Sequence, residues 1–157
     1  MKSFSLIIGV FSLFASLSCQ AQETKQTEEK QVLAFADSVV KWIEKKDIKT
    51  LQSRTGKVID CYACSEEFTK KYEGYKFPAA DFYKEEFKRL FGTDLLTRLK
   101  RNKTIYVKQP EEKNLHVVYY TIFNKDEAAP GHEGGQFGIW VTKENGQYKI
   151  YGFDTIP

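Results

Sequence analysis

Two cysteines three positions apart, Cys61 and Cys64, are the residues of this sequence whose type and spacing most directly imply chemistry. They stand in the stretch VIDCYACSEE (Val58–Glu67), between an apolar run and a serine that can begin a helix. Such a pair can form a structural disulfide, exchange disulfides with other proteins, or supply half of a zinc site. The compartment and the surrounding elements decide among these three roles.

The N-terminus indicates export. Its first 21 residues, MKSFSLIIGVFSLFASLSCQA, hold one lysine, an apolar run from Phe4 to Leu17 and small residues before a charged tract, which is typical of a signal peptide. A lipoprotein peptidase cutting before Cys19 would leave that sulfur lipidated, whereas ordinary cleavage after Ala21 would remove it. We expect an exported bacterial protein that is periplasmic or membrane-anchored, with membrane contact only through lipid on Cys19.

Either route leaves Cys61 and Cys64, and an oxidising compartment favours a disulfide between them, worth about 2 kcal/mol for so short a loop. Thiol exchange has one local argument, a strand before the pair and a helix after it. Zinc would need both cysteines with His116 and His132, and a second pair at short spacing is missing. Ser65 stands where haem attachment needs a histidine. We predict a structural disulfide, with no metal and no cofactor.

Composition predicts one globular domain, because 41% of the residues are hydrophobic and 29% are charged. Of the 24 Lys and Arg residues only Lys2 lies in the signal, so 23 basic residues face 21 acidic ones and no nucleic-acid partner is implied. Residues 22–30 hold nothing apolar and predict a flexible tether. We therefore divide the chain into a signal (1–21), a tether (22–30) and a single α+β domain (31–157).

The elements that must position the cysteines and the aromatic residues follow from periodicity and from helix-end residues. Helices are predicted at 29–46, 48–54, 65–72, 78–92 and 94–100, and strands at 58–61, 104–108, 115–124, 136–143 and 147–154. Asn145-Gly146 suits a two-residue type I′ turn between the last two strands. With that turn, Val141 pairs with Ile150 and Trp140 pairs with Tyr151.

Both faces of the predicted sheet carry apolar side chains, so helices can cover only one of them. The second face, which would include Trp140, Tyr151 and Phe153, also needs a cover, and a dimer would supply it. The candidate ligand-binding residues or dimer-face residues, for which ordinary core packing is the alternative, are Tyr120, Trp140, Tyr151, Phe153 and His116.

The glycine-rich loop from Pro130 to Gly135 carries His132 and Glu133, a titratable pair that could act as a lid or ligand clamp. A hairpin connection that is longer than usual is the alternative. The glycines do not precede a helix, so the loop is not a phosphate-binding cradle.

The order of elements resembles the nuclear-transport-factor-two-like (SnoaL-like) cone-fold superfamily, as a small secreted or lipoprotein bacterial member. Two segments carry the resemblance: KDIKTL (Lys46–Leu51) after the first helix, and GQYKIYGF (Gly146–Phe153) in the closing strand. It implies an α+β fold with N-terminal helices packed on a curved antiparallel sheet, a cystatin-like cone, a conical pocket and frequent dimers. Catalytic members usually place an Asp–His pair or a similar polar cluster in the pocket, and here His116 is the only strand histidine.

We predict a non-catalytic, envelope-located domain that binds a small apolar ligand or a protein partner, with homodimerisation as one mode of partnering. No catalytic residue is assigned. One alternative is a small enzyme of the isomerase or hydrolase type that uses His116 or His132 with a nearby carboxylate. Another is a periplasmic thiol-active protein that uses Cys61 and Cys64.

Overall fold

The computed structural model describes residues 11–101, 104–109, 111, 114–127 and 134–156. The chain divides into two compact units, residues 1–31 and 32–157. Helix α1 (Phe11–Glu44) belongs to both, so it begins well before residue 29 and includes 22–30, where we predicted a tether. Whether that segment acts as a signal and tether stays a prediction. In the described part of the chain, no helix has an apolar stretch long enough to span a bilayer.

The second unit has an α+β fold, as predicted, with one mixed sheet of six strands in the order β2-β1-β6-β5-β4-β3. Only β1 and β6 run parallel, and the other neighbouring pairs are antiparallel. The predicted antiparallel sheet thus includes one parallel pair, which joins β1 to β6. The strands are β1 (Thr55–Cys61), β2 (Lys76–Pro78), β3 (Thr104–Lys108), β4 (Leu115–Phe123), β5 (Gly135–Glu144) and β6 (Gln147–Ile156).

Short helices lie between α1 and β3, with α2 before β1 and the others after it. They are α2 (Ile48–Ser53), α3 (Glu66–Lys71), α4 (Ala79–Asp81), the π-helix η1 (Phe82–Glu86), α5 (Phe87–Leu90) and α6 (Thr93–Arg101), and the 3₁₀ turn η2 (Lys125–Glu127) follows β4. Ser65 caps α3 as predicted, accepting a hydrogen bond from the Phe68 amide at 3.2 Å. The predicted 78–92 helix forms as a continuous helical run from Ala79 to Leu90, but its middle part, η1, is a π-helix in which the Phe87 amide bonds to the carbonyl of Phe82. That wider turn lets Phe82, Glu86 and Phe87 all face the interior.

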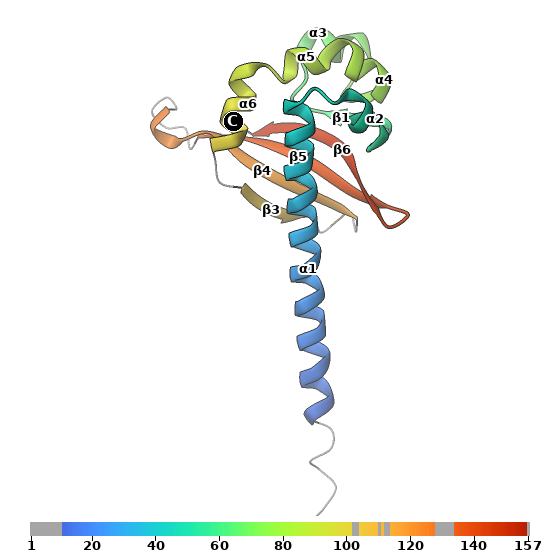
Figure 1. The fold of residues 1–157 in the computed structure, drawn as a ribbon, viewed down its shortest axis with the longest axis vertical. Coiled ribbons are helices and arrows are strands. Elements are labelled where there is room, and N and C mark those ends of the chain that lie inside the picture. The colour runs from blue at the N-terminus through green and yellow to red at the C-terminus, as the bar shows by residue number, and fades with distance from the viewer. Residues whose placement is uncertain (1–10, 102–103, 110, 112–113, 128–133, 157) are drawn as a thin grey trace, which may run out of the picture. The chain divides into compact units, whose positions relative to one another are not determined.

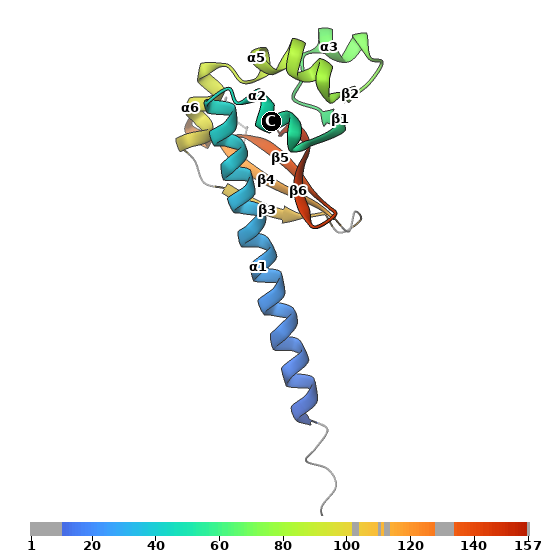
Figure 2. The same ribbon diagram turned by 45° about the vertical axis from the view of Figure 1, so that its right-hand side comes forward.

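The helices pack against one side of the sheet, which we call the inner face. Alternate residues of β4 and β5, such as Val118, Tyr120, Phe137 and Ile139, point into this core. Figures 1 and 2 show the C-terminal part of α1 lying across β4 and β5. The helices contribute to the same cluster Val32, Ala36, Val39, Ile43, Leu51, Phe68, Phe82, Phe87, Phe91 and Leu99.

The turn between β5 and β6 forms as predicted. Asn145 and Gly146 have φ values of 48° and 78°, as a type I′ turn requires. Val141 pairs with Ile150, which confirms the predicted register next to the turn.

Beyond that point the register shifts, and Trp140 pairs with Gly152 rather than with Tyr151. The shift places Phe153 opposite Ile139 on the inner face, where it is buried in the core. The prediction that Phe153 shares a face with Trp140 is therefore wrong. A β-bulge, which adds one residue to one strand of a pair, reverses the face of every residue beyond it.

Candidate interaction surface

The opposite side of the sheet, which we call the outer face, carries most of the exposed apolar side chains. Strand alternation places Val58 and Ile105 there, because their neighbours Ile59 and Tyr106 pack in the core. Among the described residues, six large hydrophobic side chains are exposed. One of them, Phe123, lies under the guanidinium of Arg98, and the other five lie on the outer face. The five on the outer face, which are 41% to 52% exposed, are Val58, Tyr62, Tyr75, Ile105 and Ile156.

Four aromatic rings form a continuous line on this face, and we call them the aromatic row. The ring centroids of Tyr75 and Tyr62 are 4.7 Å apart, and those of Tyr62 and Trp140 are 5.6 Å apart. Tyr151 continues the row, stacked on Trp140 at 6.3 Å with an interplanar angle of 2°. The row joins side chains from β5, β6, the end of β1 and the residue before β2, which are distant in sequence.

A buried carboxylate lies beside the row. Asp154 is 8% exposed, and its Oδ2 accepts a hydrogen bond from the Tyr119 hydroxyl at 3.3 Å. Burial raises the pKa of Asp154, although the nearby Trp140 indole, the Tyr119 hydroxyl and the Gly138 amide favour the charged form. Trp140 Nε1 and Asp154 Oδ1 are both buried, and neither atom has a hydrogen-bond partner within normal geometry among the described residues. Burial, followed by the charge of Asp154, raises the pKa of Tyr119 to about 12.

The charges on the outer face are of both signs. Asp60 is largely buried, and one of its carboxylate oxygens lies 3.7 Å from Lys76 Nζ. Lys149 lies opposite Thr142, and Glu144 lies near the turn on the same face. The face is therefore apolar at its aromatic row without a strong net charge around it.

The predicted disulfide is present. Cys61 and Cys64 are joined with their Cα atoms 5.4 Å apart. Cys61 is 0% exposed at the end of β1, whereas Cys64 is partly exposed. Tyr62 lies between the two cysteines, so one member of the aromatic row belongs to the disulfide-closed loop.

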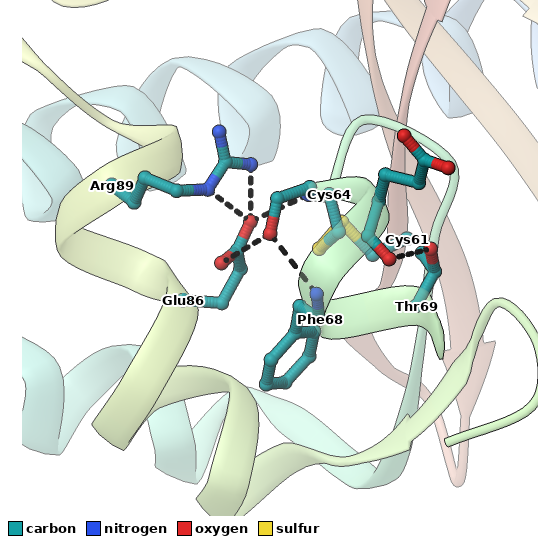
Figure 3. The surroundings of a disulfide bond; sticks show 8 residues. Cys61, Cys64, Phe68, Thr69, Glu86 and Arg89 are labelled. Atoms are coloured by element: carbon teal, nitrogen blue, oxygen red, sulfur yellow. Dashed lines mark hydrogen bonds and ion pairs between the residues drawn. A yellow bond between two sulfur atoms is a disulfide. The ribbon is translucent and has the colours of Figure 1, made fainter. Parts of the chain in front are cut away.

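Glu86 binds the residue that follows this loop, Ser65, and Figure 3 shows Glu86 beside the disulfide. Its Oε1 accepts the Ser65 amide at 2.8 Å, and its Oε2 accepts the Ser65 hydroxyl at 3.2 Å. Arg89 donates to Oε1 through Nε at 2.6 Å and through a second guanidinium nitrogen. Burial acts to raise the pKa of Glu86, but Arg89 and Ser65 hold it below its usual value. A charged carboxylate thus links η1 to the start of α3.

The predicted site residues do not form one cluster. Trp140 and Tyr151 lie in the aromatic row, but Tyr120, His116 and Phe153 are buried on the inner face. His116 Nδ1 lies 3.0 Å from the hydroxyl of Tyr106, and its ring contacts Tyr148. Burial, with a contribution from Asp37, raises the pKa of Tyr120.

The lid residues His132 and Glu133, and the side chain of Cys19, lie outside the described residues. Their roles, and the binding roles of the aromatic residues, stay predictions. Within the described residues, no group of three or more His, Cys, Asp and Glu side chains is arranged to hold a metal ion.

Sequence reasoning missed Tyr62, Tyr75 and Asp154. Tyr62 could have been found, because a strand that directs Cys61 inward directs the next residue outward. Tyr75 precedes a strand of three residues, which is too short to give a pattern. Asp154 was missed because the bulge in β6, which turns it to the face of Trp140, was not predicted.

The chain matches no known family model, and no curated protein matches its sequence. A comparison with solved structures finds the association domain of C. elegans CaMKII, which is 12% identical. The match covers 86% of this chain and 99% of that chain, with a TM-score of 0.49.

Proposed function

We propose that this protein is an exported, non-catalytic interaction domain that binds a second copy of itself through the outer face of its sheet. The observation that carries the proposal is the aromatic row, bordered by exposed Val58 and Ile105 on a face that the described helices do not cover. Contiguous exposed apolar surface of this kind marks interaction sites in soluble proteins.

The size and composition of the face suit one standard protein interface. Alternate residues of six strands place roughly 20 residues on the outer face, and one partner contributes about 20 to 30 residues to a stable complex. Tyrosine and tryptophan are enriched at the centres of such interfaces, and charged residues lie at their rims. Trp140 has this central position on β5, with Val58 near one sheet edge and Ile105 at the other.

A second copy fits this face because the face carries charges of both signs, so two copies of it need not repel each other. Asp60 with Lys76, and Glu144 with Lys149, place opposite charges on the same surface, so two-fold pairing can bring unlike charges together. The cone-fold superfamily that the sequence resembles is frequently dimeric, which agrees with this choice. An apolar small molecule or a different protein as the occupant would contradict it.

The envelope location is part of the same proposal. It is supported by the signal-like N-terminus and by the disulfide, since disulfides persist in oxidising compartments. The non-catalytic assignment is supported by the burial of His116 against a tyrosine hydroxyl in the core.

Two lysine substitutions test the dimer. Val58→Lys and Ile105→Lys each place a charge on an exposed position of the face, so neither disturbs the core of a monomer. Burying an unpaired charge in an interface is strongly unfavourable, so we expect each variant to weaken dimerisation more than about tenfold in sedimentation equilibrium. Phe123→Ala is the matched control. It also changes an exposed hydrophobic side chain, but one that contacts Arg98 and does not belong to the proposed dimer surface.

The expected result is a dimeric wild type, a dimeric Phe123→Ala protein and mainly monomeric lysine variants. A wild type that stays monomeric at every concentration reached would contradict the proposal. So would lysine variants that dimerise as tightly as the control. Native mass spectrometry of the wild type showing a monomer with a bound small molecule would instead assign the face to a ligand.

A further inference from the structure

We propose that the Cys61–Cys64 disulfide is a redox control on the interaction surface, because it holds Tyr62 in the aromatic row. Reduction of the disulfide frees Tyr62 and weakens self-association while the fold persists. This inference rests on the proposed dimer, whose surface it regulates.

Tyr62 lies at the junction of the aromatic row. The side chain of Cys61 is fully buried, and Tyr62, the next residue, points to the outer face with 47% of its surface exposed. Its ring contacts both Tyr75 and Trp140. Tyr62 therefore joins the β2 end of the row to the β5 and β6 part, and a displaced Tyr62 would divide the row in two.

The loop that contains Tyr62 is held at both ends. Before the loop, the Cys61 amide donates to the Tyr75 carbonyl and the Tyr62 amide to the Phe153 carbonyl, both at 2.8 Å. After it, Ser65 is bound to Glu86. The disulfide closes the segment between these anchors. Apart from its ring contacts, Tyr62 is otherwise held through its backbone amide, so loss of the disulfide lets the side chain of Tyr62 and residue Ala63 move while β1 and α3 stay attached.

The chemistry also follows from burial. A thiolate of a dithiol reductant attacks the sulfur of Cys64, the more exposed of the two, and forms a mixed disulfide while Cys61 leaves as a thiolate. The second thiol of the reductant then displaces Cys64. In total two electrons and two protons pass to the protein, which gains two thiols, and the reductant becomes a disulfide. A thiol-exchange enzyme needs an accessible attacking cysteine, and burial of Cys61 disfavours that role.

The test compares dimer dissociation constants of the full chain in sedimentation equilibrium. Its oxidised form, its form reduced with dithiothreitol and a Cys61→Ala/Cys64→Ala variant are measured, with circular dichroism as the check on folding. An aromatic contact of this kind contributes enough that we expect about fivefold to tenfold weaker dimerisation in the latter two. In a Tyr62→Ala background, the effect of reduction should disappear, because the two changes act through one side chain.

Ser65→Ala is the control for general loosening of the loop. It removes the cap of α3 and the hydroxyl bond to Glu86 but leaves the disulfide intact, so its dimer should match wild type.

Reduction that leaves dimerisation unchanged would overturn the inference but not the dimer, as would an undiminished effect of reduction in the Tyr62→Ala background. Global unfolding on reduction would also overturn the inference, because redox control of the surface requires a reduced form that is still folded. Oxidised protein that is monomeric would instead refute the proposed function.

Discussion

At the scale of single residues, Gly138 decides whether a carboxylate can lie beside the aromatic row. A β-carbon built at this position would be 1.8 Å from Asp154 Oδ1 and 2.9 Å from the ring of Tyr119. Asp154 thus occupies the space that a side chain on β5 would fill, and any residue larger than glycine displaces it. Asp154 already lacks a hydrogen bond at Oδ1, so a displacement that also broke the bond from Tyr119 to Oδ2 would leave the buried carboxylate without a side-chain partner.

We expect Gly138→Ala to lower the free energy of unfolding by about 2 to 3 kcal/mol, because crowding against a buried carboxylate forces the backbone or Asp154 to move. Urea denaturation of the purified protein measures this. Gly74→Ala is the matched control, since a β-carbon there meets nothing within 4 Å, and it should change stability by less than about 0.5 kcal/mol. Equal stability of the two variants would show that Asp154 does not occupy this space in solution.

At the scale of elements, the helical region is attached to the disulfide turn by one buried carboxylate. Glu86 is in η1, and it binds the amide and hydroxyl of Ser65, the residue that caps α3. The π turn makes this possible, because it brings Glu86 to the same side as Phe82 and Phe87. The cap of one helix therefore depends on the irregularity of another.

We expect Glu86→Gln to cost about 2 kcal/mol at neutral pH, because hydrogen bonds from Arg89 and Ser65 to a charged acceptor are among the stronger ones. The folded pKa of Glu86 lies below the usual 4.5, so its contribution is complete above that pH and is lost as pH falls through the folded pKa. Unfolding curves of wild type and variant should therefore converge in acid.

Glu85→Gln serves as the comparison for this substitution. Glu85 is paired at the surface with Lys71 at 2.6 Å, and such pairs contribute less than about 1 kcal/mol. If the Glu86 and Glu85 variants were equally stable at neutral pH, Glu86 would not be the link between η1 and α3.

Local signals predicted those elements whose cause lies within a few residues. Asn145-Gly146 specifies its turn through positive φ, and Ser65 specifies the start of α3 through its side chain. The bulge in β6 depends instead on β1, whose Asp60 carbonyl lies 2.4 Å from where a β-carbon of Gly152 would be. That parallel neighbour is almost one hundred residues away in sequence, and Gly152 was the only local sign of it.

The candidate surface was predictable only in part for the same reason. The sequence indicated a second apolar face and identified Trp140 and Tyr151 on it, since both follow from the hairpin. Tyr62 and Tyr75 join them only because β1 and β2 pack beside β6, which no short-range pattern encodes.

At the scale of the whole molecule, the proposed export and the proposed dimer depend on the same disulfide. The described core residues of the inner face all lie within residues 32–157. The outer face is the proposed dimer surface, and its aromatic row contains Tyr62, which lies in the loop that the disulfide closes. If the protein is exported as we propose, an oxidising compartment keeps Cys61 and Cys64 joined and so holds Tyr62 in place.

Intact-mass analysis of the protein from its own host tests this condition. Cleavage before Cys19 with lipidation, or after Ala21, leaves no free thiol outside the disulfide. We therefore expect a mass that lacks at least residues 1–18, no alkylation before reduction, and two alkyl groups after it, one on each cysteine of the pair. A mass that retains Met1 to Ser18, or two cysteines that alkylate without reduction, would place the protein in a reducing compartment. In that case the two cysteines would normally be reduced, Tyr62 would not be held in the aromatic row, and the disulfide would not control the surface.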